Sequence, residues 1–317
     1  MEREFIHEPL PAAGASMVNA MTVDVEEYFQ VSAFEQHIDP QRWDSMPSRV
    51  EASMERILAL FELADVKATF FTLGCVAKRH PQMVRRVVAA GHEIASHGMR
   101  HVRANTQDRQ SFQADVTQAR KLLQDISDQP IKGYRAASYS IGRDNLWAHD
   151  VLAEAGYTYS SSIYPGQHDR YGMPEAPRFP FRLQPDGLLE IPVTTVELRG
   201  RRFPCGGGGF FRAYPYVLSR SAIRRVNNRD RRPALFYFHP WEIDPEQPRV
   251  PRVDVKTRVR HYLNLKRMEP RLRSLLIDFR WQRMDQVYPI PAAENNQTTR
   301  EAATVVSEVM RKEFSTP

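Results

Sequence analysis

The sequence HEIASHGMRH, residues 92–101, joins a predicted strand to a pair of histidines. Residues 92–96 have the short apolar character of a buried strand. A helix is predicted on each side of it, over 81–90, which starts with proline and is stopped by glycine, and over 108–127. A strand between helices is the repeating unit of an α/β fold with parallel strands, whose functional sites lie where the strands end. The histidines therefore stand where such a fold places its site.

The same alternation continues in both directions along the chain. Further strands are predicted at 17–25, 68–73, 133–137 and 235–239, and further helices at 48–63, 144–155 and 256–278. Ser48 is a candidate cap for the helix that follows it. The chain is thus expected to form an α/β fold in which the residues after each strand meet at one edge.

Composition divides the chain into a main domain and two ends. Residues 1–16, rich in Pro, Ala and Gly, are expected to form a flexible lead-in, and residues 291–317 a polar tail. Residues 17–290 are expected to form one domain. Within it, residues 165–234 are rich in Pro, Gly and Arg and include CGGGG at 205–209, which favours an inserted loop region over the mouth of a barrel.

Bulk composition is that of an ordinary globular protein. The 317 residues are 42% hydrophobic, which suffices for a large core. The formal charge is +6, but 44 basic residues face 38 acidic ones spread along the chain, so nucleic acid is not an expected partner. Two cysteines give neither a disulfide framework nor a Cys-rich zinc motif. No secretory signal or membrane-spanning run is visible, which makes the cytoplasm the expected location and leaves the oligomeric state open.

The two histidines of the first motif, His97 and His101, are candidate metal ligands. Residues four apart face the same way if the segment turns helically, and their imidazoles can then converge on one divalent ion. Histidines at this spacing also occur by chance on ordinary surfaces, so the pair needs a further ligand to indicate a metal site.

A carboxylate pair at the end of the first strand supplies that ligand. Asp24 and Glu26 are two residues apart, and residues i and i+2 of a strand point to the same side. One carboxylate can complete a metal site while the other accepts and donates protons. The alternative is that these acids, together with Glu27, form a polar strand end or cap the next helix. Combined with the histidine pair, the functional interpretation is favoured.

Two more strand ends carry groups that suit the same pocket. Arg135 follows the strand at 133–137, and a guanidinium beside a carboxylate keeps it ionised and oriented. His239 ends the strand at 235–239, where it suits a general acid for a leaving amine. Taken alone, Arg135 is also compatible with a surface salt bridge and His239 with a core histidine. Aromatic residues near the same pocket, which could stack on a substrate or pack in the core instead, are Tyr28, Phe29, Tyr139, Phe210, Phe211 and Trp241.

Five motifs in fixed order give the sequence a family resemblance. They are TVDVEE (22–27), TFFTLG (69–74), HEIASHGMRH (92–101), GYRAAS (133–138) and FYFHPWE (236–242). This set resembles the polysaccharide deacetylases, the NodB-homology or carbohydrate esterase family 4 enzymes, over about residues 20–245. The resemblance implies a deformed (β/α) barrel with fewer strands than the usual eight, and a zinc or similar ion.

Three longer stretches narrow the resemblance. They are VDVEEYFQVSAFE (23–35), GGGGFFR (206–212) and HPWEID (239–244). These stretches look like the branch found beside bacterial exopolysaccharide export (exosortase) loci, which has its own carboxy-terminal extension. That likeness implies association with export machinery, beside the inner membrane and without a span in the chain itself.

One position departs from the family pattern. The common motif has adjacent aspartates, a base and then a metal ligand, whereas Asp24 is followed by Val25. Adjacent strand residues point apart, so Glu26 is the better substitute, and its extra methylene helps it to reach the ion. Glu27 is a weaker candidate.

The resemblance then implies a role for each residue. Glu26, His97 and His101 are the expected metal ligands, with Zn²⁺ the expected ion, although His/carboxylate sites also accept cobalt, nickel or manganese. Asp24 would take the proton of water and Arg135 would keep it anionic. A backbone N–H near Ser138 would hold the oxyanion, and His239 would protonate the leaving nitrogen. Tyr139, Phe210, Phe211 and Trp241 are the expected substrate contacts.

The expected function is therefore metal-dependent removal of N-acetyl groups from amino sugars of a polysaccharide or its precursor. Two alternatives stay open. One is amide hydrolysis on a small non-sugar molecule, and the other is a glycan-binding protein without catalysis, for which the Val25 departure is the only sign. The sequence names neither the sugar nor the linkage.

Overall fold

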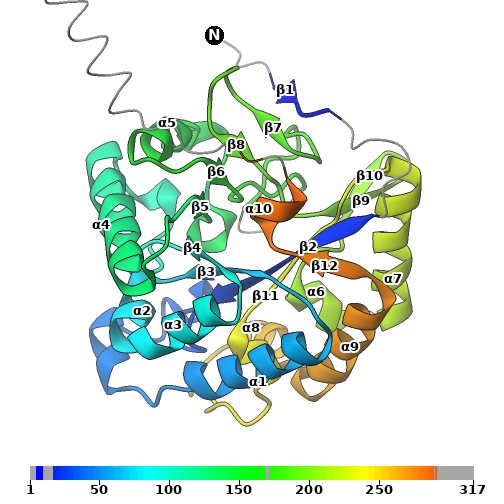
Figure 1. Ribbon diagram of the computed structural model, residues 1–317. Coiled ribbons are helices and arrows are strands. Elements are labelled where there is room, and N and C mark those ends of the chain that lie inside the picture. The colour runs from blue at the N-terminus through cyan, green and yellow to red at the C-terminus, as the bar shows by residue number, and fades with distance from the viewer. Residues whose placement is uncertain (1–4, 10–16, 169–170, 289, 291–317) are drawn as a thin grey trace, which may run out of the picture.

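The computed structural model describes residues 5–9, 17–168, 171–288 and 290. Strands and helices alternate along its first half, and shorter elements follow (Figure 1). The strands are β1 (Ile6–His7), β2 (Val18–Val25), β3 (Thr69–Thr72), β4 (Glu93–Ser96), β5 (Gly133–Tyr134), β6 (Tyr159–Ser160), β7 (Phe181–Arg182), β8 (Leu189–Glu190), β9 (Thr195–Leu198), β10 (Arg201–Pro204), β11 (Leu235–Phe238) and β12 (Arg280–Gln282). The helices are α1 (Val50–Leu63), α2 (Gly74–Arg79), α3 (Pro81–Ala89), α4 (Arg109–Ser127), α5 (Trp147–Glu154), α6 (Gly208–Ala213), α7 (Tyr216–Arg225), α8 (Val255–Tyr262), α9 (Leu265–Asp278) and α10 (Met284–Val287).

Ten of these strands form one sheet in the order β1-β7-β8-β6-β5-β4-β3-β2-β11, with β12 also paired to β2. All pairs from β8 to β11 are parallel, while β7 and β1 run antiparallel at one end. Within the described residues the order is an open path rather than a ring. Helices α1, α3, α4, α7 and α9 lie around the strands (Figure 1), as in a barrel whose helices surround its sheet. The expected α/β fold with a deformed, incomplete barrel is confirmed.

Local signals explain several element boundaries. Pro81 occupies the first turn of α3, where its missing N–H is not needed. The side chain of Asp108 caps α4 by accepting a hydrogen bond from the Ser111 amide at 2.7 Å. Ser48, by contrast, does not cap α1. Its hydroxyl donates to Glu27, which also accepts from the backbone amide that precedes α1.

The inserted region is more regular than a loop. Residues 165–234 contain strands β7 to β10 and helices α6 and α7. Its glycines serve close approach within the protein: a Cβ atom on Gly206 would lie 2.4 Å from the carbonyl oxygen of Leu235, and one on Gly208 would lie 2.3 Å from Glu242 Oε1. The expected single helix at 256–278 is two helices, α8 and α9, because Asn264 between them adopts a left-handed φ of 55°.

The expected ends fall mostly outside the described residues, which include neither 10–16 nor 291–317. Ile6 and His7, within the expected lead-in, form β1 and pair with β7. The domain boundaries stay a prediction. No helix in the described part of the chain combines the length and apolar character needed to cross a membrane.

Candidate active site

The register of the parallel strands brings the site residues to one level. Neighbouring strands pair through a single row that consists of Val25, Thr72, Ser96 and Tyr134. Glu26, His97 and Arg135 each follow one of these residues, so they emerge side by side at the carboxyl edge of the sheet. On the other side of β2, β11 is paired so that His239 emerges next to Asp24.

Strand alternation separates Asp24 and Glu26 from the residue between them. Val25 is 1% exposed and belongs to the main hydrophobic core, whereas both carboxylates line a cavity. The carboxylates nevertheless lie deep, because each residue is only 2% exposed. The structure thus places Glu26 in the cavity wall and Val25 in the core, while the role of Glu26 as a metal ligand stays a prediction.

Three residues form a candidate metal site. One donor atom from each of Glu26, His97 and His101 lies within 4.8 Å of the other two. The Nδ1 atom of His97 is 2.8 Å from the carbonyl oxygen of Arg135, which turns Nε2 toward the site, as is usual for a ligating histidine. The Oε2 atom of Glu26 is buried without a directed hydrogen bond to a described residue, although His101 Nε2 lies 3.0 Å away. A shared divalent cation would satisfy both atoms, so the three side chains fit a metal ion.

The histidines converge by a different route from the one expected. Residues 97–101 form a loop and not a helical turn, with left-handed φ values of 80° at Gly98 and 55° at His101. The loop is held by the carboxylate of Asp115, which accepts the amide hydrogen of Met99 at 3.2 Å. The two imidazole centres lie 5.3 Å apart. Loop curvature therefore replaces helical periodicity in bringing the rings together.

Asp24 rests on a buried guanidinium. Arg135 is fully buried, and its Nη1 atom lies 2.5 Å from Asp24 Oδ1. Nη1 also donates to the hydroxyl of Thr22, whereas Nη2 and Nε donate to Ser161. The Cζ atom stacks 3.9 Å from the ring centre of Phe71. Burial alone would lower the pKa of Arg135, but the charge of Asp24 raises it. The guanidinium therefore stays protonated and holds Asp24 in one orientation.

His239 faces the same carboxylates from the opposite side. Its Nε2 atom lies 3.6 Å from Glu26 Oε1 and 4.0 Å from Asp24 Oδ2, and its Nδ1 atom lies 2.8 Å from Glu242 Oε1. Burial would lower the pKa of His239, but Glu26, Glu242 and Asp24 together raise it to about 9. The imidazole is thus held ready to donate a proton at neutral pH.

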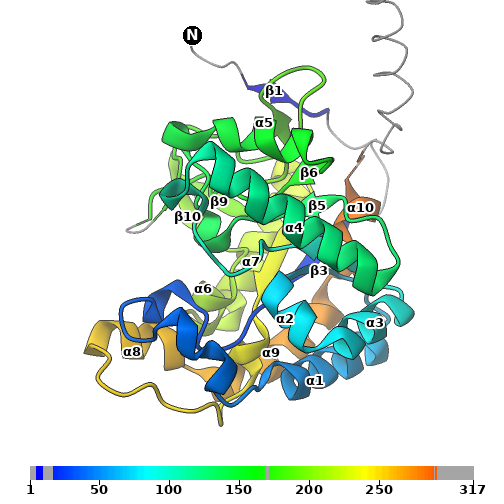
Figure 2. The same cartoon turned by 90° about the vertical axis from the view of Figure 1, so that its left-hand side faces the viewer.

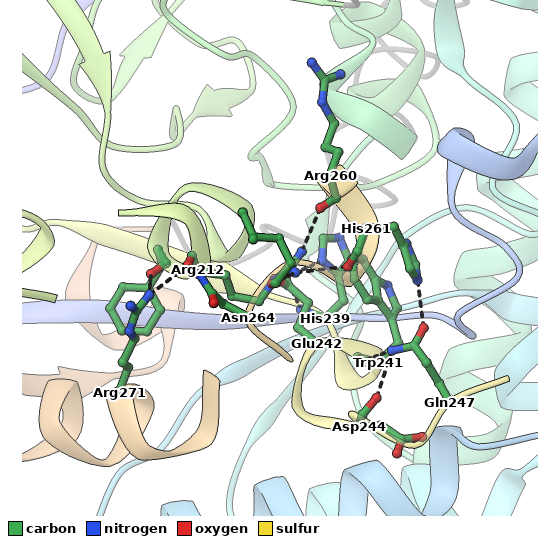
Figure 3. A network of polar contacts seen from close by, with 12 residues as sticks. Arg212, His239, Trp241, Glu242, Asp244, Gln247, Arg260, His261, Asn264 and Arg271 are labelled. Carbon is green, nitrogen blue, oxygen red and sulfur yellow. Dashed lines mark hydrogen bonds and ion pairs between the residues drawn. The ribbon is translucent and has the colours of Figure 1, made fainter. Parts of the chain in front are cut away.

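A buried network supports Glu242 in turn (Figure 3). Arg212 Nε donates to Glu242 Oε2 at 2.6 Å, and both side chains are almost fully buried. The same guanidinium donates to the carbonyl oxygens of His261 at 3.0 Å and Leu263 at 2.6 Å, which lie at the end of α8. Asn264 returns a hydrogen bond to the carbonyl of Arg212. One arginine on α6 thereby connects the partner of His239 to the turn between α8 and α9.

The carboxylates and imidazoles line a cavity of about 640 Å³, hereafter the catalytic cavity. The predicted residues that line it are Asp24, Glu26, His97, His101, Ser138, Tyr139, Phe210, His239 and Trp241. Ser138 has a left-handed φ of 55°, and its hydroxyl lies 2.6 Å from that of Ser32. The indole of Trp241 stacks on His239 and donates to Glu26 at 3.1 Å.

The structure corrects the expectation for Phe211. This side chain is 1% exposed, packs edge-on against Phe236 in the core with ring centres 5.0 Å apart, and does not line the catalytic cavity. Tyr28 and Phe29 also pack in a hydrophobic cluster rather than in the cavity wall. Glu27, the weaker ligand candidate, lies against the start of α1 instead of joining the metal donors.

Sequence reasoning missed several residues of the site. Arg212 and Glu242 lie within the GGGGFFR and HPWEID stretches, whose charged residues were the available signal. Tyr237 lies between Phe236 and Phe238, which pack in the core, so the alternation of side chains along β11 could have placed it on the cavity side. Further lining residues that carried no local signal are His168, Tyr171, Val255, Lys256, Val259, Arg260 and Leu263.

Two family models match the chain in succession. Residues 41–160 match the model described as "Polysaccharide deacetylase", and residues 161–289 match one described as "Domain of unknown function (DUF3473)". The first match contains His97, His101 and Arg135, and the second contains His239 together with its supporting network. The candidate site is therefore assembled from both matched regions and from β2, which precedes them.

Two curated relatives carry related names. The chitooligosaccharide deacetylase of Sinorhizobium fredii is 36% identical over 99 residues, which are 31% of this chain and 44% of that protein. The peptidoglycan-N-acetylglucosamine deacetylase of Bacillus cereus is 29% identical over 76 residues, which are 24% of this chain and 36% of that protein. The chain thus spans less than half the length of these curated relatives.

A solved structure extends the likeness to the whole fold. The crystal structure of a Mycobacterium smegmatis protein assigned as a polysaccharide deacetylase has a TM-score of 0.56, with 90% of this chain and 93% of that chain covered at 19% identity. At this identity the likeness concerns the fold alone. Residues 41–160 thus match polysaccharide deacetylases in sequence, and the chain as a whole is similar in fold to a structure of the same description.

Proposed function

We propose that the protein is a metal-dependent hydrolase that removes N-acetyl groups from amino sugars of a polysaccharide or its precursor. The proposal rests on one observation: a candidate base and a candidate acid lie next to the same three candidate metal ligands. Asp24, backed by Arg135, and His239, backed by Glu242, both face the cluster of Glu26, His97 and His101. Hydrolysis of an amide needs a base for water and an acid for the leaving nitrogen, and the cavity holds one candidate for each.

Glu26, His97 and His101 would hold the metal ion, for which zinc is the proposed identity. When bound, such an ion supplies Lewis acidity, which lowers the pKa of water and polarises a carbonyl group. Asp24 would then accept a proton from the attacking water, and its ion pair with the buried Arg135 holds the carboxylate in place for this task. His239 would give a proton to the departing sugar nitrogen through Nε2.

The oxyanion would be met by a backbone N–H in the turn at Ser138. The left-handed backbone at Ser138 and Tyr139 bends this turn next to the cavity, and Ser138 is part of the cavity wall. Tyr139, Phe210 and Trp241 would contact the sugar, since all three line the cavity.

Acetate release from a panel of N-acetylated oligosaccharides tests the proposal. Activity should disappear with a chelator and return when Zn²⁺ is added back. Asp24→Asn should reduce turnover by roughly 10²- to 10⁴-fold with the zinc content unchanged. Asp186→Asn, a change of the same kind at an exposed position, is the matched control. Undiminished activity in Asp24→Asn would exclude it as the base.

The same assay separates the two alternatives. Hydrolysis of small non-sugar amides without activity on any oligosaccharide would favour the amide hydrolase. Oligosaccharide binding without acetate release, in a protein that holds no stoichiometric metal, would favour an inactive glycan-binding protein. Association with export machinery, which the GGGGFFR and HPWEID stretches suggest, stays a prediction; affinity purification with proteins of an export locus would test it.

A further inference from the structure

One wall of the catalytic cavity is an exposed apolar row on α8. Val255, Val259 and Leu263 follow one another at intervals of four residues, so they share one helix face that continues into the residue after α8. They are 75%, 52% and 38% exposed, and all three line the catalytic cavity. The opposite face of α8 turns Thr257 and His261 into the protein, where both are buried. The row therefore faces the cavity and not the core.

Other apolar side chains continue this wall. Phe210 and Ala213 of α6, and Val31 and Ala33 from the segment after β2, line the same cavity. Figure 2 shows α8 at the edge of the molecule, below α6. Single exposed apolar residues are common on protein surfaces, but several of them in the wall of one cavity indicate a binding surface. A free glycan chain, covered with hydroxyl groups, does not need a wall of aliphatic side chains.

A second cavity of about 460 Å³ adjoins the first and has a different character. The two cavities share Ser32, Ala33 and Ser138 as lining residues, so they lie next to each other at this point. The second cavity is lined mainly by polar residues, which are Ser32, Glu35, Gln36, His37, Arg103, Ser138, Asp254 and Thr257. Its hydrogen-bonding groups suit sugar hydroxyls. The catalytic cavity thus has a polar cavity beside it and an apolar wall of its own.

We infer that the substrate is amphiphilic: an N-acetylated saccharide joined to a hydrocarbon chain, as in a lipid-linked precursor, rather than a free polysaccharide. The inference rests on the proposed deacetylase function. The saccharide occupies the polar cavity and presents its acetamido group to Asp24 and His239. The hydrocarbon lies along Val255, Val259 and Leu263, where burial of apolar surface contributes to binding.

Two matched substrates test the inference on the zinc-loaded full chain. They are the methyl and dodecyl β-glycosides of N-acetylated chitotriose, both used below the micellar concentration of the dodecyl compound. The dodecyl glycoside should have a kcat/KM at least about tenfold higher, through a lower KM with similar kcat. Calorimetric binding of the corresponding deacetylated glycosides should show the same ratio, and that measurement needs no turnover.

Substitutions on α8 locate the effect. The double variant Val255→Asp/Val259→Asp should bring the dodecyl-to-methyl ratio of kcat/KM close to one. Both positions are more than half exposed, so neither change removes core contacts. Ile277→Asp is the matched control, because Ile277 is an apolar residue on α9 that is 85% exposed and does not line the cavity. It should keep the wild-type ratio.

The outcomes for the two proposals are distinguishable. Equal binding of dodecyl and methyl glycosides overturns the amphiphilic substrate even if both release acetate. In another outcome, the dodecyl glycoside binds more strongly, the double variant loses this preference, and neither glycoside releases acetate. That result overturns the deacetylase function but supports the apolar binding site on α8. Two further outcomes would also overturn the amphiphilic substrate, if the two glycosides bind equally. Binding to plain phosphatidylglycerol vesicles that the double variant abolishes would assign the row to a membrane surface. Dimer formation in the ultracentrifuge that the double variant abolishes would assign it to a second copy of the chain.

Discussion

Glu242 holds His239 by both its ring and its backbone. The Oε1 atom of Glu242 lies 2.8 Å from Nδ1 of His239 and accepts the backbone N–H of the same residue at 3.2 Å. Since Arg212 occupies the other carboxylate oxygen, Glu242 has one orientation, and the ring must direct Nε2 into the catalytic cavity. Glu242 is therefore a positioning residue for the proposed acid.

Glu242→Gln should slow only reactions whose leaving group needs a proton. Acetate release from an N-acetylated oligosaccharide should fall roughly ten- to a hundredfold, because an amine cannot depart as an anion. Hydrolysis of 4-nitrophenyl acetate should change little, since nitrophenolate leaves unprotonated. Glu246→Gln, an exposed neighbour, serves as the control. Equal losses on both substrates would assign Glu242 a merely structural role.

Arg135→Gln should destabilise the fold strongly. The substitution leaves the buried carboxylate of Asp24 without its cation, and removal of one partner of a buried pair costs about 3–5 kcal/mol. Urea denaturation measures the change in the free energy of unfolding. Arg143→Gln, which breaks an exposed pair with Glu175, should cost less than about 1 kcal/mol. Adding Asp24→Asn to Arg135→Gln should recover part of the loss; strict additivity would argue against the pairing.

Neighbouring phenylalanines should respond in opposite ways. Phe211→Ala removes a buried ring from the core and should lower the free energy of unfolding by about 3–5 kcal/mol. Phe210→Ala removes a half-buried ring from the cavity wall and should raise KM with a much smaller change in stability. Thermal unfolding and steady-state kinetics of the two variants provide the comparison. A raised KM for Phe211→Ala at unchanged stability would contradict the assignment.

Glu93 should make stability depend on pH. Burial, together with the charge of Asp285, raises the pKa of Glu93 to about 7 from an ordinary value of 4.5. Because the folded protein holds this proton more tightly than the unfolded chain, the stabilisation is present below pH 4.5 and is lost as the pH rises through 7. At about 1.4 kcal/mol per pKa unit, the loss amounts to roughly 3 kcal/mol.

Glu93→Gln removes this titration. The variant should gain stability relative to the wild type between pH 5 and pH 8, as measured by the midpoint of urea unfolding at each pH. The exposed change Glu62→Gln should leave the pH profile unaltered. A constant difference between Glu93→Gln and the wild type across this range would show that Glu93 does not titrate on folding.

Much of the candidate site was predictable because strand ends are local features. The apolar runs of β2, β4 and β11 could be read from the sequence, and each is followed by a residue of the site, which are Glu26, His97 and His239. Parallel strands place their carboxyl ends at one edge, so proximity followed from the fold class. The prediction erred where the chain's conformation depends on distant contacts. The loop at His97–His101 is held by Asp115, and neither its left-handed residues nor that contact has a periodic signature.

The second half of the chain was less predictable for the same reason. Gly206 and Gly208 suggested a loop, but they mark places where the backbone presses against β11 and Glu242. Phe210 and Phe211 carry identical side chains, and only their places on α6 send one to the cavity and the other to the core. Exposure on α8 likewise depends on what surrounds the helix, which its apolar residues alone do not reveal.

By itself the sequence predicted the fold class and named candidate metal donors, a candidate acid and a candidate base. These predictions rest on apolar periodicity, on the residues next to strand ends and on the resemblance of the motifs to a known family. Only the tertiary structure decided which residues support them and what shapes the cavity. The support of Glu242 by Arg212, and the apolar row at Val255, Val259 and Leu263, arise from contacts between segments far apart in the chain. Such contacts depend on three-dimensional distance, which local sequence patterns do not encode.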